Sequence, residues 1–317
     1  SSIKNLLHLS IPIFFANLAI PLVAIVDTGL MGNLDDASYL TATSIASSLF
    51  SMIFWSFGFL RMGTVGMVAK AHGSNQYNEI VDLVFRNITF VIVISLLLIF
   101  LQHFIFNLGL QIFDLSNDTE KYFKDYFDIR IYSSFGELTI YVITGLFIGL
   151  QKTKISSVVV GFFSVTNIIF SLFFVLYFKL NVTGVALGTL VSSTLTSFIF
   201  LIYTFFELKK LTNINFDIKK IFNVKKIQNI FNINFNIFVR SVLLTFSFLF
   251  FTYLGNTISE DVVAANTILI NLIFLSAFIL DAYAFSTEGI VGYSIGSKNI
   301  TLLRNVIKNS FMLSAST

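Results

Sequence analysis

The sequence has 317 residues, of which 56% are hydrophobic and only 12% charged, and its mean hydropathy is +0.85. Soluble domains carry about 25% charged residues, so this chain has too few polar residues to cover a globule in water. The composition excludes a soluble enzyme, a nucleic-acid-binding protein and a secreted disulfide scaffold. The chain has no cysteine, and its three histidines are scattered without ligand spacing, so we expect no metal site.

Long apolar runs predict eight membrane-spanning helices and the start of a ninth. Each run approaches the roughly 20 residues that a helix needs to cross a hydrocarbon core about 30 Å thick. The strand-like alternation of an outer-membrane barrel is absent, so the chain is predicted to be an all-α polytopic membrane protein. The predicted spans are 11–31, 43–70, 88–110, 129–150, 156–178, 184–206, 234–255 and 263–292, with the ninth starting near 302.

The basic residues predict the orientation. Loops on the membrane side that carries the N-terminus hold fourteen Lys and Arg residues, against four on the opposite side. By the positive-inside rule this places the N-terminus in the cytoplasm, in a bacterial-type plasma (inner) membrane. The four opposite residues are Lys121, Lys124, Arg130 and Lys179.

An internal repeat at an offset of 223 residues organises the chain. It aligns Met31–Asn33 with Leu254–Asn256 and His72–Ser74 with Ile295–Ser297, with Gly at equivalent helix ends. Six predicted spans separate the copies, an even number, so the repeat is parallel, an arrangement found in some transporters. The offset sets Thr317 opposite position 94, so the second copy is expected to be incomplete.

The repeat suggests three parts. Residues 1–206 are expected to form an N-terminal lobe of six spans, and 231–317 part of a C-terminal lobe. The segment 207–230 between them alternates Lys pairs with apolar residues, so it is either a topology-fixing cytoplasmic loop or a segment that lies along the membrane surface.

Four segments resemble the multidrug and toxic compound extrusion (MATE) transporters, particularly the DinF-type branch. They are Pro21–Thr28 (PLVAIVDT), Phe57–Thr64 (FGFLRMGT), Gly145–Thr153 (GLFIGLQKT) and Leu280–Gly289 (LDAYAFSTEG). The resemblance implies a two-lobe helical bundle with parallel six-helix repeats, of which this chain supplies the first lobe and part of the second. It also implies a non-enzymatic secondary transporter.

Polar side chains predicted at a similar depth in the outer half indicate a hydrated pocket. They are Asp27 in the first span, Glu137 in the fourth, and Asn167 and Ser171 in the fifth. Acids inside spans are costly and point to function, and an acid in such a pocket can exchange protons near neutral pH. A structural, hydrogen-bonded Asp27 is the alternative.

Pro21 is expected to kink the first helix, because it removes the backbone hydrogen bond to the carbonyl of Asn17. Protonation of Asp27 would then alter how this helix bends. By resemblance, Asp27 matches the protonation residue of the family. Members with a proton relay carry Asn and, four residues later, Asp in the fifth helix. Here Asn167 is followed by Ser171, so the relay would rest on Asp27, with Glu137 either substituting for the acid or packing locally.

A second charged group is predicted in the cytoplasmic half. Asp281 and Glu288 are two turns apart on one face of the eighth span, and Arg61 in the second span falls at a depth between theirs. We expect the three to face each other across the lobe interface as a cytoplasmic gate. The alternative is that Arg61 snorkels to the inner headgroups and Glu288 lies at a wet helix end. The pairs Gly145/Gly149 and Gly184/Gly188 have the spacing of close helix contacts.

These observations predict an antiporter that exports amphipathic, often cationic, organic compounds in exchange for protons by alternating access. It would use a proton gradient rather than a cofactor, act as a monomer, and contact only its small-molecule substrate and lipid. Sodium coupling, a lipid-linked-precursor flippase and an inactive truncated fragment are the alternatives. A flippase of this superfamily needs a cationic cavity for a pyrophosphate, whereas the predicted outer-half charges are acids; an ion channel would need a pore-lining ring.

Overall fold

The computed structural model describes residues 3–113, 115–213, 221–258 and 260–316, and these residues form helices joined by short turns. The helices are α1 (Ile3–Gly32), α2 (Ala37–Ser56), α3 (Phe59–Gly73), α4 (Tyr77–Phe100), α5 (Gln102–Ile112), α6 (Asn117–Arg130), the 3₁₀ turn η1 (Ile131–Ser133), α7 (Ser134–Gly149), α8 (Thr153–Leu172), the π turn η2 (Phe173–Tyr177), α9 (Val182–Leu211), α11 (Val224–Ile258), α12 (Glu260–Gly296) and α13 (Ile300–Ser316).

Eight helical segments in the described part of the chain are long and apolar enough to cross a membrane. Two of them join successive helices: α2 continues into α3, and α6 into α7 through η1. The all-α polytopic class predicted from the sequence is confirmed. Local capping fixes several helix starts; the Asp36 side chain, for example, accepts a hydrogen bond of 2.8 Å from the Ser38 backbone N–H at the start of α2.

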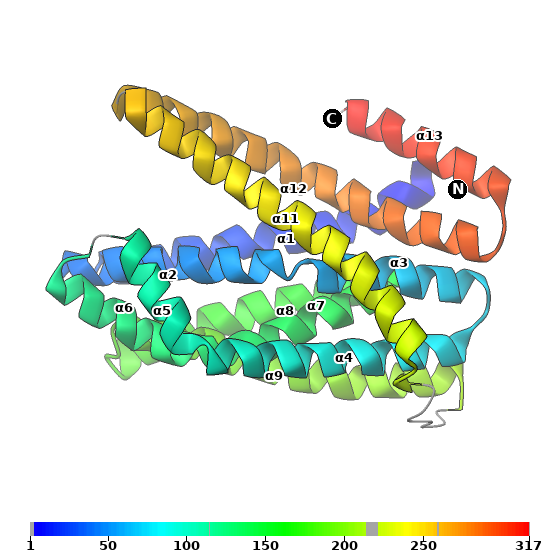
Figure 1. Cartoon of the computed structure of the whole chain (residues 1–317), viewed down its shortest axis with the longest axis horizontal. Coiled ribbons are helices and arrows are strands. Elements are labelled where there is room, and N and C mark those ends of the chain that lie inside the picture. The colour runs from blue at the N-terminus through cyan, green and yellow to red at the C-terminus, as the bar shows by residue number, and fades with distance from the viewer. Residues whose placement is uncertain (1–2, 114, 214–220, 259, 317) are drawn as a thin grey trace.

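The helices run antiparallel, so their connections lie at two ends (Figure 1). We call the end with connections 74–76, 150–152 and 297–299 the linker end, and the opposite end, with 33–36 and 178–181, the far end. Helices α1–α9 form the N-terminal bundle, and α11–α13 are the C-terminal helices. In Figure 1 the linker end is on the right, where α12 runs beside α3, whereas toward the far end α11 and α12 diverge from α1 and α2.

The two sets of helices meet through backbone contacts between equivalent positions of the repeat. A Cβ added at Gly73 of α3 would lie 2.8 Å from the Tyr293 carbonyl carbon and 3.0 Å from Ser297 N on α12. A Cβ added at Gly296 would lie 2.9 Å from the Lys70 carbonyl carbon and 3.0 Å from Ser74 N. The offset of 223 relates each member of the first contact to one of the second. A pseudo-twofold axis therefore passes between α3 and α12 at the linker end.

The third span begins earlier than the sequence predicted, at Tyr77 rather than at 88. Its first turns hold charges that suggested a loop, but the structure pairs them. Arg86 is 1% exposed and lies 3.0 Å from Glu79 and 3.6 Å from Asp82. Mutual neutralisation removes most of the cost of placing these charges on a packed helix.

The basic segment 207–230 is largely helical where the structure describes it, and it is held to the N-terminal bundle. Helix α9 continues to Leu211 and α11 begins at Val224. Between them, the Ile221 carbonyl accepts a 2.6 Å hydrogen bond from Arg86 Nε, and Lys226 at the start of α11 forms an ion pair with Glu79. Part of the predicted segment, 214–220, lies outside the described residues.

The predicted close glycine contacts are confirmed. Gly145 and Gly149 of α7 face the α3 backbone, since an added Cβ would lie 2.7 Å from the Arg61 carbonyl oxygen and 2.9 Å from that of Val65, respectively. Gly188 of α9 lies equally close to Ser171 of α8, with an added Cβ 2.8 Å from Ser171 N. These contacts let α7 and α9 approach the helices that carry predicted site residues.

Candidate functional site

Asp27 lies on α1, five residues before the helix ends at Gly32. Its Oδ1 is buried and has no hydrogen-bond partner among the described residues. The Ser171 hydroxyl of α8 lies beside the carboxyl group, and Arg130 of α6 acts on it electrostatically. An acid in the far half with one buried, unsatisfied oxygen can bind a proton or a cation.

Ser171 and Asn167 link Asp27 to a polar network between α8 and α9. The Ser171 hydroxyl donates to Asn167 Oδ1 at 3.3 Å, and Asn167 Nδ2 donates to Thr189 Oγ1 at 3.0 Å. The Thr189 hydroxyl in turn donates to the Val185 carbonyl at 3.3 Å. Asn167 and Ser171 are buried. The structure therefore brings together three of the four residues that the sequence assigned to one pocket.

Glu137 lies deeper than the sequence predicted. The fourth membrane segment begins at Asn117 instead of 129, so Glu137 is closer to its linker-side end, at Gly149, than to its far-side start. The Glu137 carboxylate forms an ion pair with Arg130 and accepts a 2.9 Å hydrogen bond from Ser133. Glu137 is thus neutralised by a partner and is not level with Asp27.

Arg130 lies inside the protein, whereas the charge pattern predicts an exposed residue on the outer side. It is only 9% exposed and lies within the bundle. Its guanidinium carbon is 5.2 Å from the ring centroids of both Phe50 and Phe54 on α2. The signal was available: Arg130 and Glu137 are seven residues apart, which puts them on one face of a continuous helix.

Pro21 and Asn17 both lie within α1, which is helical from Ile3 to Gly32. Asn17 is 8% exposed, so its side chain faces the bundle rather than lipid. Helix α1 packs along α8. Asn17 and Pro21 are thus on the helix that carries Asp27; their roles in a relay and a hinge stay predictions.

Arg61 of α3 reaches α12, as predicted, but it contacts an aromatic ring. Its guanidinium carbon lies 4.1 Å from the Phe285 ring centroid and 5.8 Å from that of Tyr141 on α7. Asp281 and Glu288 flank Phe285 on the same face of α12 and act on Arg61 electrostatically. Neither acid forms an ion pair with Arg61 in the part of the chain that the structure describes.

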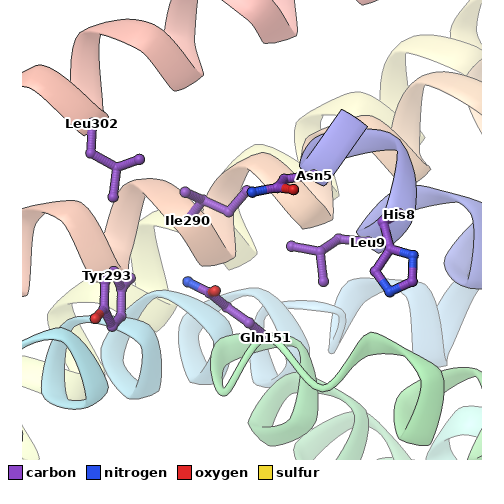
Figure 2. Close-up of a pocket in the computed structure, with 7 residues that line it drawn as sticks. All are labelled: Asn5, His8, Leu9, Gln151, Ile290, Tyr293 and Leu302. Atoms are coloured by element: carbon purple, nitrogen blue, oxygen red, sulfur yellow. The ribbon is translucent and has the colours of Figure 1, made fainter. Parts of the chain in front are cut away.

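A cavity of about 310 Å³ lies at the linker end between the two sets of helices (Figure 2). Asn5, His8 and Leu9 of α1 face Ile290 and Tyr293 of α12 across it, with Gln151 below and Leu302 of α13 above. None of the predicted site residues lines this cavity. Among the described residues, no three His, Cys, Asp or Glu side chains are grouped as a metal site would require.

The chain is similar to several known transporters. It is 28% identical over 306 residues to DNA damage-inducible protein F of Escherichia coli (strain K12), covering 96% of this chain and 66% of that protein. It is 22% identical over 257 residues to the multidrug export protein MepA of Staphylococcus aureus (strain MRSA252), covering 80% of this chain and 56% of MepA. The chain thus spans between about half and two thirds of these curated relatives.

Solved structures share the fold. A MOP-superfamily transporter from Pyrococcus furiosus Vc1 (DSM3638), described as having a binding pocket of reversed polarity, superposes with a TM-score of 0.88 at 17% identity over 98% of this chain and 69% of that one. The outward-facing conformation of a multidrug resistance MATE family transporter gives the same values.

The MatE family model matches residues 12–173, from within α1 to the end of α8, and this range includes Asp27, Arg61, Glu137 and Asn167. Together with the helical architecture and the four sequence motifs, this match shows that the chain is a multi-pass membrane protein that belongs to the MatE family.

Proposed function

We propose that the chain works as a secondary antiporter that exports amphipathic organic cations in exchange for protons. The observation that carries this proposal is the buried, unpartnered Oδ1 of Asp27 beside Ser171 in the far half of the bundle. A carboxyl group is costly inside a membrane and is retained there for function. The relatives named for multidrug export support the same activity.

Competition at one carboxylate explains exchange. Ionised Asp27 attracts a cation, and a proton that binds the same group removes that attraction. The network through Ser171, Asn167 and Thr189 holds the polar surface next to the carboxyl group in place. The position of the family's second acid is occupied by Ser171, so in this proposal Asp27 alone carries the exchangeable proton.

Alternating access is supported by the arrangement of the two sets of helices. Backbone contacts at Gly73 and Gly296 join them at the linker end, and α11 and α12 diverge from α1 and α2 toward the far end (Figure 1). With the N-terminus in the cytoplasm, as the basic loops predict, the end at which these helices diverge would face the outside. In our proposal Arg61 and Phe285, flanked by Asp281 and Glu288, belong to the cytoplasmic gate.

The setting of the transporter follows from the same reasoning. We expect a bacterial inner membrane, a cytoplasmic linker, and a monomer whose partners are an organic substrate and the surrounding lipid. The proton gradient takes the place of a cofactor.

Two alternatives remain distinct. Sodium coupling draws support from the oxygen atoms of Asp27, Ser171 and Asn167, because hard cations prefer oxygen ligands. The flippase draws support from Arg130, a far-half cation that the sequence argument overlooked. Arg130 is paired with Glu137, so the net charge of this region is the negative charge of Asp27. A negative net charge favours a cationic substrate.

The test is efflux of a fluorescent organic cation from liposomes that contain the 317-residue chain, in sodium-free buffer with an imposed pH gradient. We expect efflux driven by the proton gradient, loss of this efflux in Asp27→Asn, and retention in Asp35→Asn, whose carboxylate is exposed at the far end. Efflux that requires sodium would establish the sodium-coupled variant. Proton-driven efflux that persists in Asp27→Asn would overturn the proposal.

A further inference from the structure

Buried charges continue from Asp27 toward the linker end instead of stopping at the predicted pocket. Arg130 of α6 acts on Asp27 and forms an ion pair with Glu137 of α7. Glu137 and Tyr141 are four residues apart on α7 and therefore lie on one helix face. Glu137 and Arg130 both act electrostatically on Tyr141. The first part of this series of ionisable groups therefore connects α1, α6 and α7.

The second half joins α7 to α12. The Arg61 guanidinium lies 5.8 Å from the Tyr141 ring centroid and 4.1 Å from that of Phe285. Tyr141, Asp281 and Glu288 all act electrostatically on Arg61. Arg61 Nε is buried without a hydrogen-bond partner among the described residues, so the neighbouring negative charges determine how well its charge is tolerated in the contact.

The ionisable groups along this route are few. Helix α6 supplies Tyr126 and Arg130, and α7 supplies Glu137 and Tyr141. Helix α8 packs along α1 and places the Ser171 hydroxyl beside Asp27; this hydroxyl donates to Asn167, and neither side chain ionises. On the C-terminal side, α12 supplies Asp281 and Glu288, and Arg240 of α11 acts on both.

We propose that Arg130, Glu137 and Tyr141 are positioning residues that transmit the charge state of Asp27 to the contact between Arg61 and α12. The inference rests on the proposed exchange of a proton for a cation at Asp27. Ionised, empty Asp27 shares Arg130 with Glu137, so Glu137 keeps negative potential at Tyr141, whose ring lies beside Arg61 in the closed contact. The linker end stays closed.

Neutralising Asp27 reverses this balance. With a proton or an organic cation on Asp27, Arg130 neutralises Glu137 fully, and Arg61 loses part of the negative potential that compensates it. The contact between Arg61 and Phe285 then weakens, and α12 can separate from α3. The linker end can therefore open when Asp27 carries a proton or an organic cation, and it stays closed when Asp27 is ionised and empty. Obligatory exchange requires this difference between the loaded and the empty protein.

The experiment measures two quantities in the same protein: a distance across the linker end and the binding of an organic cation. The chain has no cysteine, so spin labels at Lys154→Cys on α8 and Asn305→Cys on α13, both exposed, report the linker-end distance without background. Binding of tetraphenylphosphonium is measured by equilibrium dialysis across the same pH series. The variants are Glu137→Gln, Asp27→Asn and, as the matched control, Asp128→Asn, an exposed acid on α6.

In the parent protein we expect the open, long-distance population to increase as the pH falls, and also when tetraphenylphosphonium is added at high pH. Glu137→Gln should still bind tetraphenylphosphonium in a pH-dependent way, but its distance distribution should no longer follow pH. Glu137→Asp should restore the response, and Asp128→Asn should match the parent. If removal of one charge prevents folding, the double variant Arg130→Gln/Glu137→Gln deletes the pair without leaving an unpaired ion and should show the same uncoupling.

An unchanged distance response in Glu137→Gln or the double variant would overturn the inference. So would loss of pH-dependent binding in Glu137→Gln, because Glu137 would then belong to the binding site itself. Failure of the proposed function is distinguishable: in that case Asp27→Asn would keep pH-dependent binding, whatever Glu137 does.

Discussion

Gly73 of α3 and Gly296 of α12 occupy equivalent positions of the internal repeat, and each packs against the backbone of the other's helix. A repeat detected in the sequence thus becomes a physical contact in the fold. The contact lies on the pseudo-twofold axis, so it is the place where the two sets of helices can separate symmetrically.

Gly296→Ala should push α12 away from α3 at the linker end. The new Cβ would lie 2.9 Å from the Lys70 carbonyl carbon, a backbone atom that cannot move aside on its own. We expect the distance between labels at Lys154→Cys and Asn305→Cys to lengthen by about 1–2 Å, or the open population to grow.

Gly161→Ala on α8 is the matched control, because a Cβ there meets nothing within 4 Å. It should leave the distance unchanged and, through helix propensity, alter the free energy of unfolding by at most about 1 kcal/mol. Equal distances in Gly296→Ala and the parent would show that the contact does not hold the linker end together.

The Arg61–Phe285 contact should carry more coupling energy than Arg61 with either acid. A guanidinium 4.1 Å from a ring centroid and shielded from water should contribute about 1–2 kcal/mol. In double-mutant cycles on the open–closed equilibrium, Arg61→Met with Phe285→Leu should therefore show a larger interaction term than Arg61→Met with Asp281→Asn. The reverse order would favour the ion-pair gate that the sequence suggested.

Glu207 near the end of α9 should matter for stability, since its side chain is 8% exposed and lies 2.5 Å from both Lys152 and Lys210. Glu207→Gln removes the carboxylate that pairs with both lysines. It should lower the free energy of unfolding by about 1–3 kcal/mol. Lys210→Gln, at a side chain 70% exposed, should cost less, because ion pairs at exposed groups contribute little to stability. Chemical denaturation in detergent compares them, and similar costs would mean that burial of Glu207 does not determine its contribution.

The sequence predicted the helical class, the presence of eight spans, the parallel repeat and the placement of Asp27 with Ser171 and Asn167, because all of these follow from apolar run length and helix periodicity. It failed at Arg130 and Glu137 for a common reason. The polar start of α6, from Asn117, does not look like a membrane segment in composition. The predicted span therefore begins only at 129, with Arg130 at its outer end and Glu137 too near the far end.

The same limitation affected α4 and Arg61. Hydropathy treats Glu79, Asp82 and Arg86 as three separate costs, whereas the fold pairs them. For Arg61, charge complementarity pointed to Asp281 and Glu288, and only the three-dimensional arrangement identifies Phe285 as the group in contact. Pairing between helices is a tertiary property that a linear pattern does not contain.

In the proposed mechanism one carboxyl group, Asp27, binds either a proton or an organic cation. Calorimetric titration of the reconstituted chain with tetraphenylphosphonium, repeated in buffers of different ionisation enthalpy, counts the protons released on binding. Near the midpoint of the pH dependence the account predicts proton release in the parent protein and none in Asp27→Asn. Binding without proton release in the parent, or the same release in Asp27→Asn, would contradict it.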